Sequence, residues 1–157
     1  MLGRFGACLA GASSLLAVAA LPGAASAHDN TQQQGPGHFS IRLTPEEVAT
    51  GGNPGGSGEA RLDLDQARET ACYFLEWRGL KGDVTAAHLH VGPRLQDGPH
   101  VIDFFNDQHF AGRRSTASGC VRSSQDTIQA IIGNPSGYYI NIHTTEFKPG
   151  AIRGQLG

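Results

Sequence analysis

Apolar and polar residues alternate with a period of two in several short segments of this chain. Successive side chains of a β-strand point to opposite faces, so this alternation predicts strands with one buried face. Clusters of glycine, proline and polar residues separate the segments and are typical of turns. The predicted strands cover residues 39–43, 59–65, 71–80, 84–91, 100–105, 138–144 and 151–156.

These strands and one short helix together predict an all-β fold. Residues 126–132 are expected to form one or two helical turns, because Gly133 and Pro135 follow them. Residues 44–58 are expected to form a long loop, and residues 106–119 are expected to be polar and irregular. Seven short strands divided by turns favour an antiparallel β-sandwich, with Greek-key connections of the immunoglobulin-like or superoxide-dismutase-like kind.

The first 27 residues have the pattern of a secretory signal peptide. Arg4 precedes an apolar run over residues 7–21, and Ala25-Ser26-Ala27 fits the rule of small residues at a cleavage site. The apolar run is too short and too interrupted for a stable membrane span. Residues 28–37 are polar and without periodicity, which predicts a flexible tail before a domain over residues 38–157. We therefore expect a secreted or periplasmic protein with no membrane span after cleavage.

Charge and cysteine content agree with export. Without the expected signal peptide, 11 basic residues stand against 14 acidic ones, a net charge of −3 that does not suit nucleic-acid binding. Two cysteines then remain, Cys72 and Cys120. In an oxidising compartment a lone pair of cysteines is most simply a disulfide, so we expect these two to be bonded.

Two of the predicted strands carry histidines on their polar faces. In residues 84–91, alternation places His88 and His90 on the face opposite the aliphatic residues, and Asn141 and His143 have the same position in the second strand. Neutral imidazoles are good ligands for copper and zinc, and three of them leave one coordination position open. If the two strands lie close together, His88, His90 and His143 form a candidate metal site.

The same histidines admit a second interpretation, in which they only join two strands. Their partners would then be backbone groups together with Asn141, Thr144 or Arg153. Two further histidines are candidate additional ligands. His100 lies on the next predicted strand, where its neighbours favour a packed or rim position. His28 would become the N-terminal residue after cleavage, and a free α-amine beside an imidazole can chelate copper.

Three motifs, in this order, resemble those of the CHRD domain, the module named after chordin and found alone in many exported bacterial proteins. They are Ala87-His88-Leu89-His90-Val91-Gly92-Pro93, Tyr139-Ile140-Asn141-Ile142-His143-Thr144 and Gly150-Ala151-Ile152-Arg153-Gly154-Gln155-Leu156. The resemblance covers residues 39–157 and implies a β-sandwich and an extracytoplasmic location. It implies no enzymatic activity.

Three functional hypotheses follow. The first is an exported module that binds an extracytoplasmic protein or a small ligand and holds copper or zinc through His88, His90 and His143. The second is a copper-dependent redox enzyme, because a His-x-His pair followed by a distant histidine is similar to the copper half of Cu/Zn superoxide dismutase. The third is a structural or adhesive extracellular domain without a metal.

Overall fold

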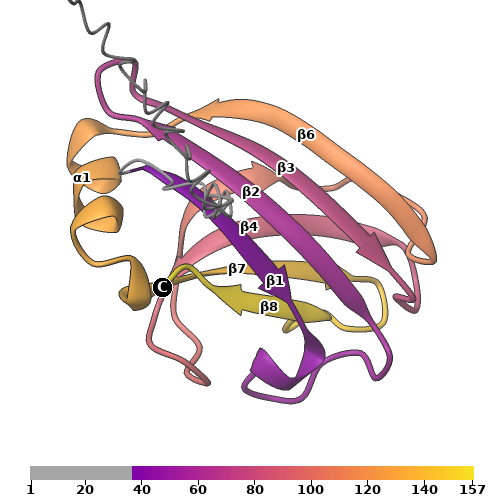
Figure 1. The fold of residues 1–157 in the computed structure, drawn as a ribbon. Coiled ribbons are helices and arrows are strands. Elements are labelled where there is room, and N and C mark those ends of the chain that lie inside the picture. Colours follow the sequence, from indigo (N-terminus) through magenta and orange to yellow (C-terminus); the bar gives the residue numbers. More distant parts are fainter. Residues whose placement is uncertain (1–36) are drawn as a thin grey trace, which may run out of the picture. The chain divides into compact units, whose positions relative to one another are not determined.

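Residues 37–157 are described by a computed structural model, in which they form two antiparallel sheets (Figure 1). The first sheet has the order β1-β2-β3-β6 and contains β1 (His38–Leu43), β2 (Ser57–Asp65), β3 (Thr70–Arg78) and β6 (Arg114–Arg122). The second has the order β5-β4-β7-β8 and contains β5 (His100–Phe105), β4 (Val84–Val91), β7 (Tyr138–Thr144) and β8 (Ile152–Gln155). The short helical elements are η1 (Pro45–Glu47), α1 (Gln125–Gly133) and η2 (Pro135–Gly137).

The apolar faces of the two sheets meet in one hydrophobic core. In β2, Ala60, Leu62 and Leu64 are buried and the residues between them are exposed, as the period of two predicts. Ile140 and Ile142 of β7 are fully buried in the same core. Burying one such side chain stabilises the fold by about 1.5–3 kcal/mol. The predicted antiparallel β-sandwich is therefore confirmed.

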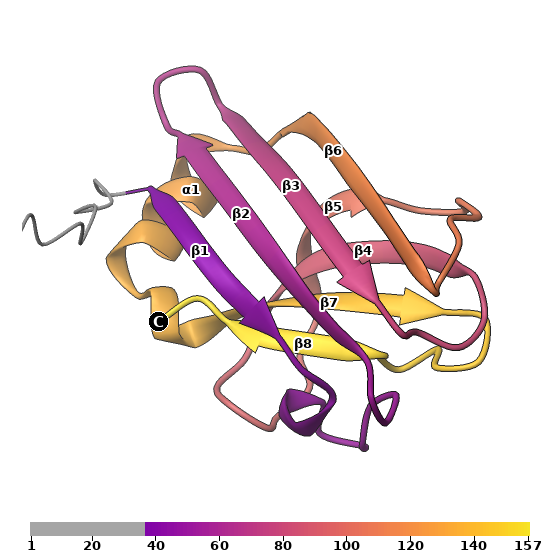
Figure 2. The same cartoon turned by 45° about the vertical axis from the view of Figure 1, so that its right-hand side comes forward.

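The chain crosses between the two sheets more than once. From β3 it enters the second sheet as β4 and β5, returns as β6, and reaches β7 through α1 (Figure 2). The last strand, β8, lies beside the first, because Thr44 and Arg153 form an antiparallel bridge with N···O distances of 2.8 and 3.0 Å.

The predicted helix is confirmed as α1, which has a clear N-terminal signal. Ser124 precedes it, and the Ser124 Oγ accepts a hydrogen bond from the Thr127 backbone N–H at 3.2 Å. Ile128 and Ile131 are fully buried. The helix therefore packs its apolar side against the core at one end of the sandwich (Figures 1 and 2).

One strand was not predicted. The described residues contain eight strands rather than seven, because β6 forms where residues 106–119 were expected to be irregular. Ala117 is its one buried residue, and the neighbouring inward positions hold Ser115 and Gly119. A Cβ at Gly119 would lie 3.1 Å from the Tyr73 Oη, so the small residue leaves room for that ring. Small residues give no apolar alternation, and the prediction was wrong for that reason.

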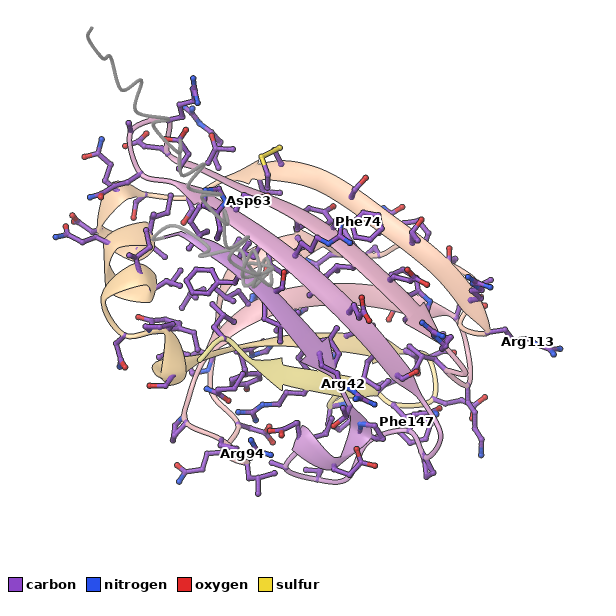
Figure 3. All side chains as sticks on the ribbon, in the orientation of Figure 1. Arg42, Asp63, Phe74, Arg94, Arg113 and Phe147 are labelled. Atoms are coloured by element: carbon purple, nitrogen blue, oxygen red, sulfur yellow. A yellow bond between two sulfur atoms is a disulfide. The ribbon has the colours of Figure 1, made fainter. Side chains whose placement is uncertain are left out.

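The predicted disulfide between Cys72 and Cys120 is present. The two residues are direct partners in the register of β3 and β6, with Cα atoms 4.0 Å apart. Figure 3 shows the bond on the outer face of the first sheet, near Asp63, which pairs with Cys72. It closes a loop spanning 48 positions, which is worth about 4 kcal/mol in the chain-entropy estimate.

The expected signal peptide and most of the expected tail lie outside the described residues. In residues 37–157, no helix combines the length and the apolar character needed to cross a membrane.

Candidate metal site

His88, His90 and His143 lie together on the outer face of the second sheet. In the register of β4 and β7, His88 is opposite Asn141 and His90 is opposite Tyr139, which places all of these side chains on the face away from the core. One ring nitrogen from each of the three histidines lies within 4.8 Å of the other two. The alternation argument therefore predicted correctly which histidines meet.

Two of these histidines are held by backbone carbonyls. The His143 Nδ1 lies 2.8 Å from the Lys148 carbonyl oxygen, and the His90 Nδ1 lies 2.9 Å from the Gly98 carbonyl oxygen. A carbonyl oxygen only accepts hydrogen bonds, so each Nδ1 carries a proton and donates it. In a neutral imidazole the other nitrogen then has a free lone pair. Both histidines therefore present an unprotonated Nε2.

His88 is held by a side-chain amide. Its Nε2 lies 2.7 Å from the Asn106 Oδ1, and its Nδ1 lies 3.2 Å from the His143 Nε2. If His88 donates its Nε2 proton to Asn106, its Nδ1 also has a free lone pair. Two lone pairs then face each other across 3.2 Å, an arrangement that favours a cation or a shared proton between the rings.

The surroundings of His143 and His90 favour their neutral forms. The pKa of His143 is lowered to about 4, mainly by burial and also by the neighbouring histidines, against the hydrogen bond to the Lys148 carbonyl, which raises it. Burial also lowers the pKa of His90. The His90 Nε2 is buried and has no hydrogen-bond partner among the described residues. An unpaired buried polar atom is costly, so this nitrogen is available to a ligand.

Asn141 fixes the turn that holds His143. The Asn141 Nδ2 donates to the Pro149 carbonyl oxygen at 2.9 Å, next to the Lys148 carbonyl that accepts from His143. Gly150 has φ +154°, and a Cβ there would lie 2.5 Å from the Asn141 Oδ1. The close approach of this turn to the sheet therefore requires glycine at residue 150.

A column of stacked groups forms one wall of the site. The Tyr139 ring stacks on His90 with centroids 4.8 Å apart and planes 11° apart. On Tyr139 lies the guanidinium of Arg153, whose central carbon is 3.3 Å from the ring centroid. Arg153, which was a candidate partner of the histidines in the interpretation without a metal, lies on the outer face of the sheet and is fully buried.

The loop of residues 92–98 covers this column. Arg153 donates to the carbonyl oxygens of Gln96 at 2.9 Å and Pro93 at 2.8 Å. The Gly98 N–H donates to the Tyr139 Oη at 3.0 Å, which places the Gly98 carbonyl beside His90. Arg153 thus affects the position of His90 in two ways. Its guanidinium lies on the Tyr139 ring that stacks on His90, and its hydrogen bonds hold the loop whose Gly98 carbonyl accepts from His90.

The loop has a second attachment at its outer edge. Arg94 forms an ion pair with Glu47 of η1, at the lower edge of the view in Figure 3. Its side chain is largely exposed, so this pair contributes little compared with the buried contacts of Arg153.

A search with family models connects this architecture to known proteins. The model of the CHRD domain matches residues 39–156. The chain belongs to the CHRD domain family. Searches of curated proteins and of solved structures returned no match. Membership of the family, together with the disulfide, points to an extracellular binding module.

The other predicted site residues of this CHRD domain have different positions. The His100 ring lies 4.8 Å from that of His88, but His100 is exposed and contacts Asp103. Thr144 is fully buried on the core side, where its Oγ1 accepts from the Phe147 N–H at 3.0 Å. Thr144 therefore does not support the histidines. His28 lies outside the described residues.

Several groups that hold the CHRD histidines were not predicted from the sequence. The carbonyl oxygens of Gly98 and Lys148 belong to the backbone, which gives no residue signature. Asn106 lies in a loop whose path the sequence does not indicate. Tyr139 could have been found, because it has the same parity along β7 as Asn141 and His143.

Proposed function

We propose that this CHRD domain is an exported binding module that holds one divalent transition-metal ion, copper or zinc, with His88, His90 and His143. One observation carries the proposal. Each histidine has one ring nitrogen hydrogen-bonded to an oxygen, and one ring nitrogen from each lies within 4.8 Å of the other two. Such outer hydrogen bonds are the usual way in which proteins fix the tautomer and orientation of metal-binding histidines.

The donor set and its spacing suit these ions. Zinc–nitrogen bonds of about 2.0–2.1 Å place two ligand nitrogens roughly 3.3 Å apart in a tetrahedral site. The His88 Nδ1–His143 Nε2 distance is 3.2 Å, and the third nitrogen lies within 4.8 Å of both.

Three protein ligands leave a position for an external ligand. A carboxylate of an extracytoplasmic protein, or a small anion, would fit a coordination position on copper or zinc. The same open position supports the second candidate, a copper-dependent redox enzyme, because redox catalysis also needs a metal that substrate can reach. The two functions differ in the metal required, since zinc does not change its oxidation state.

Metal analysis tests the proposal. The protein is exported, purified without chelators and assayed for bound metal, then titrated with zinc and copper while its melting temperature is followed. We expect one metal ion per chain. At a free concentration 100 times the Kd, binding adds about 2.7 kcal/mol, or roughly 10 °C in Tm.

Variants assign the binding to the three histidines. His88→Ala/His143→Ala should bind no metal and gain no thermal stability. The matched control His38→Ala/His109→Ala removes two exposed histidines and should behave like the wild type. A wild-type protein without stoichiometric metal and without a thermal shift would leave the metal-free structural domain as the explanation. Binding of zinc but not copper would exclude the redox enzyme.

A further inference from the structure

We infer that this CHRD domain has a second metal position, formed by His88, His100 and Asp103. Each of these residues offers one ligand atom, and the three atoms lie within 4.8 Å of one another. The inference rests on the proposed function, because His88 would serve both positions. The ligand class is a divalent ion that accepts mixed nitrogen and oxygen donors, such as zinc.

The two ring nitrogens of His88 point toward different groups. Its Nδ1 lies 3.2 Å from the His143 Nε2, on the side of the first site. Its Nε2 lies 3.8 Å from the Asp103 Oδ1, on the side of β5. As an imidazolate, deprotonated at both nitrogens, His88 could therefore contact one ion on each side of its ring.

Irregular pairing between β4 and β5 brings the other two donors together. Asp103 is the direct partner of His88, but the register shifts on both sides of this pair. Residues three apart on a regular strand point to opposite faces. The shifts allow His100 to bond Asp103 through Nδ1 and to lie with its ring 4.8 Å from that of His88. β-Bulges that re-aim side chains are frequent beside functional sites.

Charge and exposure distinguish the second position from the first. The first is formed by three imidazoles, whereas the second includes the Asp103 carboxylate, which attracts a cation directly. The side chains of His100 and Asp103 are 54% and 48% exposed, while that of His88 is 12% exposed. An ion at the second position would therefore be open to solvent and exchange faster than one in the first.

Binding at the second position changes the hydrogen bond of His88. The His88 Nε2 is 2.7 Å from the Asn106 Oδ1, to which it donates. An ion on this nitrogen replaces its proton, which passes to solvent, and the bond to Asn106 is lost. Because this bond must be given up, we expect the first position to fill before the second.

Zinc titration by calorimetry, with variants, tests the inference. The wild type should bind two zinc ions, the second at least tenfold more weakly. Asp103→Asn and His100→Gln should each bind one ion, with an affinity within about twofold of the first wild-type site. The control His109→Gln/Asp83→Asn alters a matched exposed pair, whose nearest nitrogen and oxygen are 3.5 Å apart, and should retain two ions.

The outcomes separate this inference from the proposed function. One ion in the wild type, unchanged in Asp103→Asn, overturns the second position and leaves the first intact. No bound ion overturns both. One ion that is lost in Asp103→Asn but retained in His143→Ala would place the metal on the β5 side and overturn the proposed first site. Two ions that persist in Asp103→Asn and in His100→Gln would overturn the assignment of these residues.

Discussion

Replacing Arg153 with methionine should destabilise the whole domain. Methionine retains much of the apolar volume but removes the charge and every donor. The lost hydrogen bonds are those to Gln96 at 2.9 Å, Pro93 at 2.8 Å and the Gln155 Oε1 at 3.2 Å, together with the contact on the Tyr139 ring. The change therefore affects β8, β7 and the loop of residues 92–98.

The expected loss combines opposing contributions. Each charged hydrogen bond contributes about 1.5–3 kcal/mol and a buried cation–π contact about 2 kcal/mol. Against these stands the cost of burying the guanidinium, whose Nε finds no acceptor in residues 37–157. We expect a net loss of about 3 kcal/mol in the free energy of unfolding for Arg153→Met. Arg153→Lys keeps the charge but not the planar set of donors, and should lose about 2 kcal/mol.

Urea unfolding followed by circular dichroism, with the disulfide intact, measures this loss. Arg113 provides the control, because its side chain is exposed and points away from the domain (Figure 3). Arg113→Met should change the free energy of unfolding by less than about 0.5 kcal/mol. Hydrogen exchange should also show faster exchange of the Gly98 amide in Arg153→Met, because the covering loop is released. An Arg153→Met protein as stable as the control would refute this account of the buried arginine.

Three further predictions concern the disulfide, the protonation of the site and the turn beside it. The Cys72→Ser/Cys120→Ser variant should lose up to about 4 kcal/mol of unfolding free energy in urea, and equal stability would contradict the chain-entropy estimate. Burial lowers the pKa of His143 from 6.5 to about 4, so between these values the unfolded chain binds more protons than the folded one. The stability of the metal-free protein should thus be complete above pH 6.5 and fall by at most about 3 kcal/mol as the pH decreases to 4. Urea titrations across this range should show a smaller decrease for His143→Gln. Gly150→Ala should cost more than about 1 kcal/mol and weaken zinc binding, because its Cβ would collide with Asn141; unchanged calorimetry would show that the turn adapts.

Much of the fold could be predicted because the core imposes a strict period on the strands. The ranges 84–91, 100–105 and 138–144 coincide with β4, β5 and β7. Their inward positions must be apolar to be buried, so the sequence of these strands shows a visible alternation of apolar and polar residues. The inward positions of β6 hold small residues such as Ala117, which satisfy the packing without producing a pattern.

Side-chain parity along the strands predicts one part of the candidate site, namely which residues lie on the same face of the sheet. His88, His90 and His143 share a face, and neighbouring strands bring them together. The contacts that orient them come from carbonyl oxygens and from a loop, and these depend on the path of the backbone. The meeting of His100 with Asp103 depends on register shifts in β4 and β5, which alternation alone cannot indicate.

The disulfide and the proposed metal would act on overlapping lengths of chain. The covalent ring from Cys72 to Cys120 includes β4 and therefore His88, whereas His143 lies beyond it. An ion shared by His88 and His143 would close another ring, and the two cross-links would interleave along the sequence. While both cross-links are in place, the C-terminal strands could not separate from the rest of the domain. Release of the ion would become the step that allows β7 and β8 to separate from the covalently closed part of the domain.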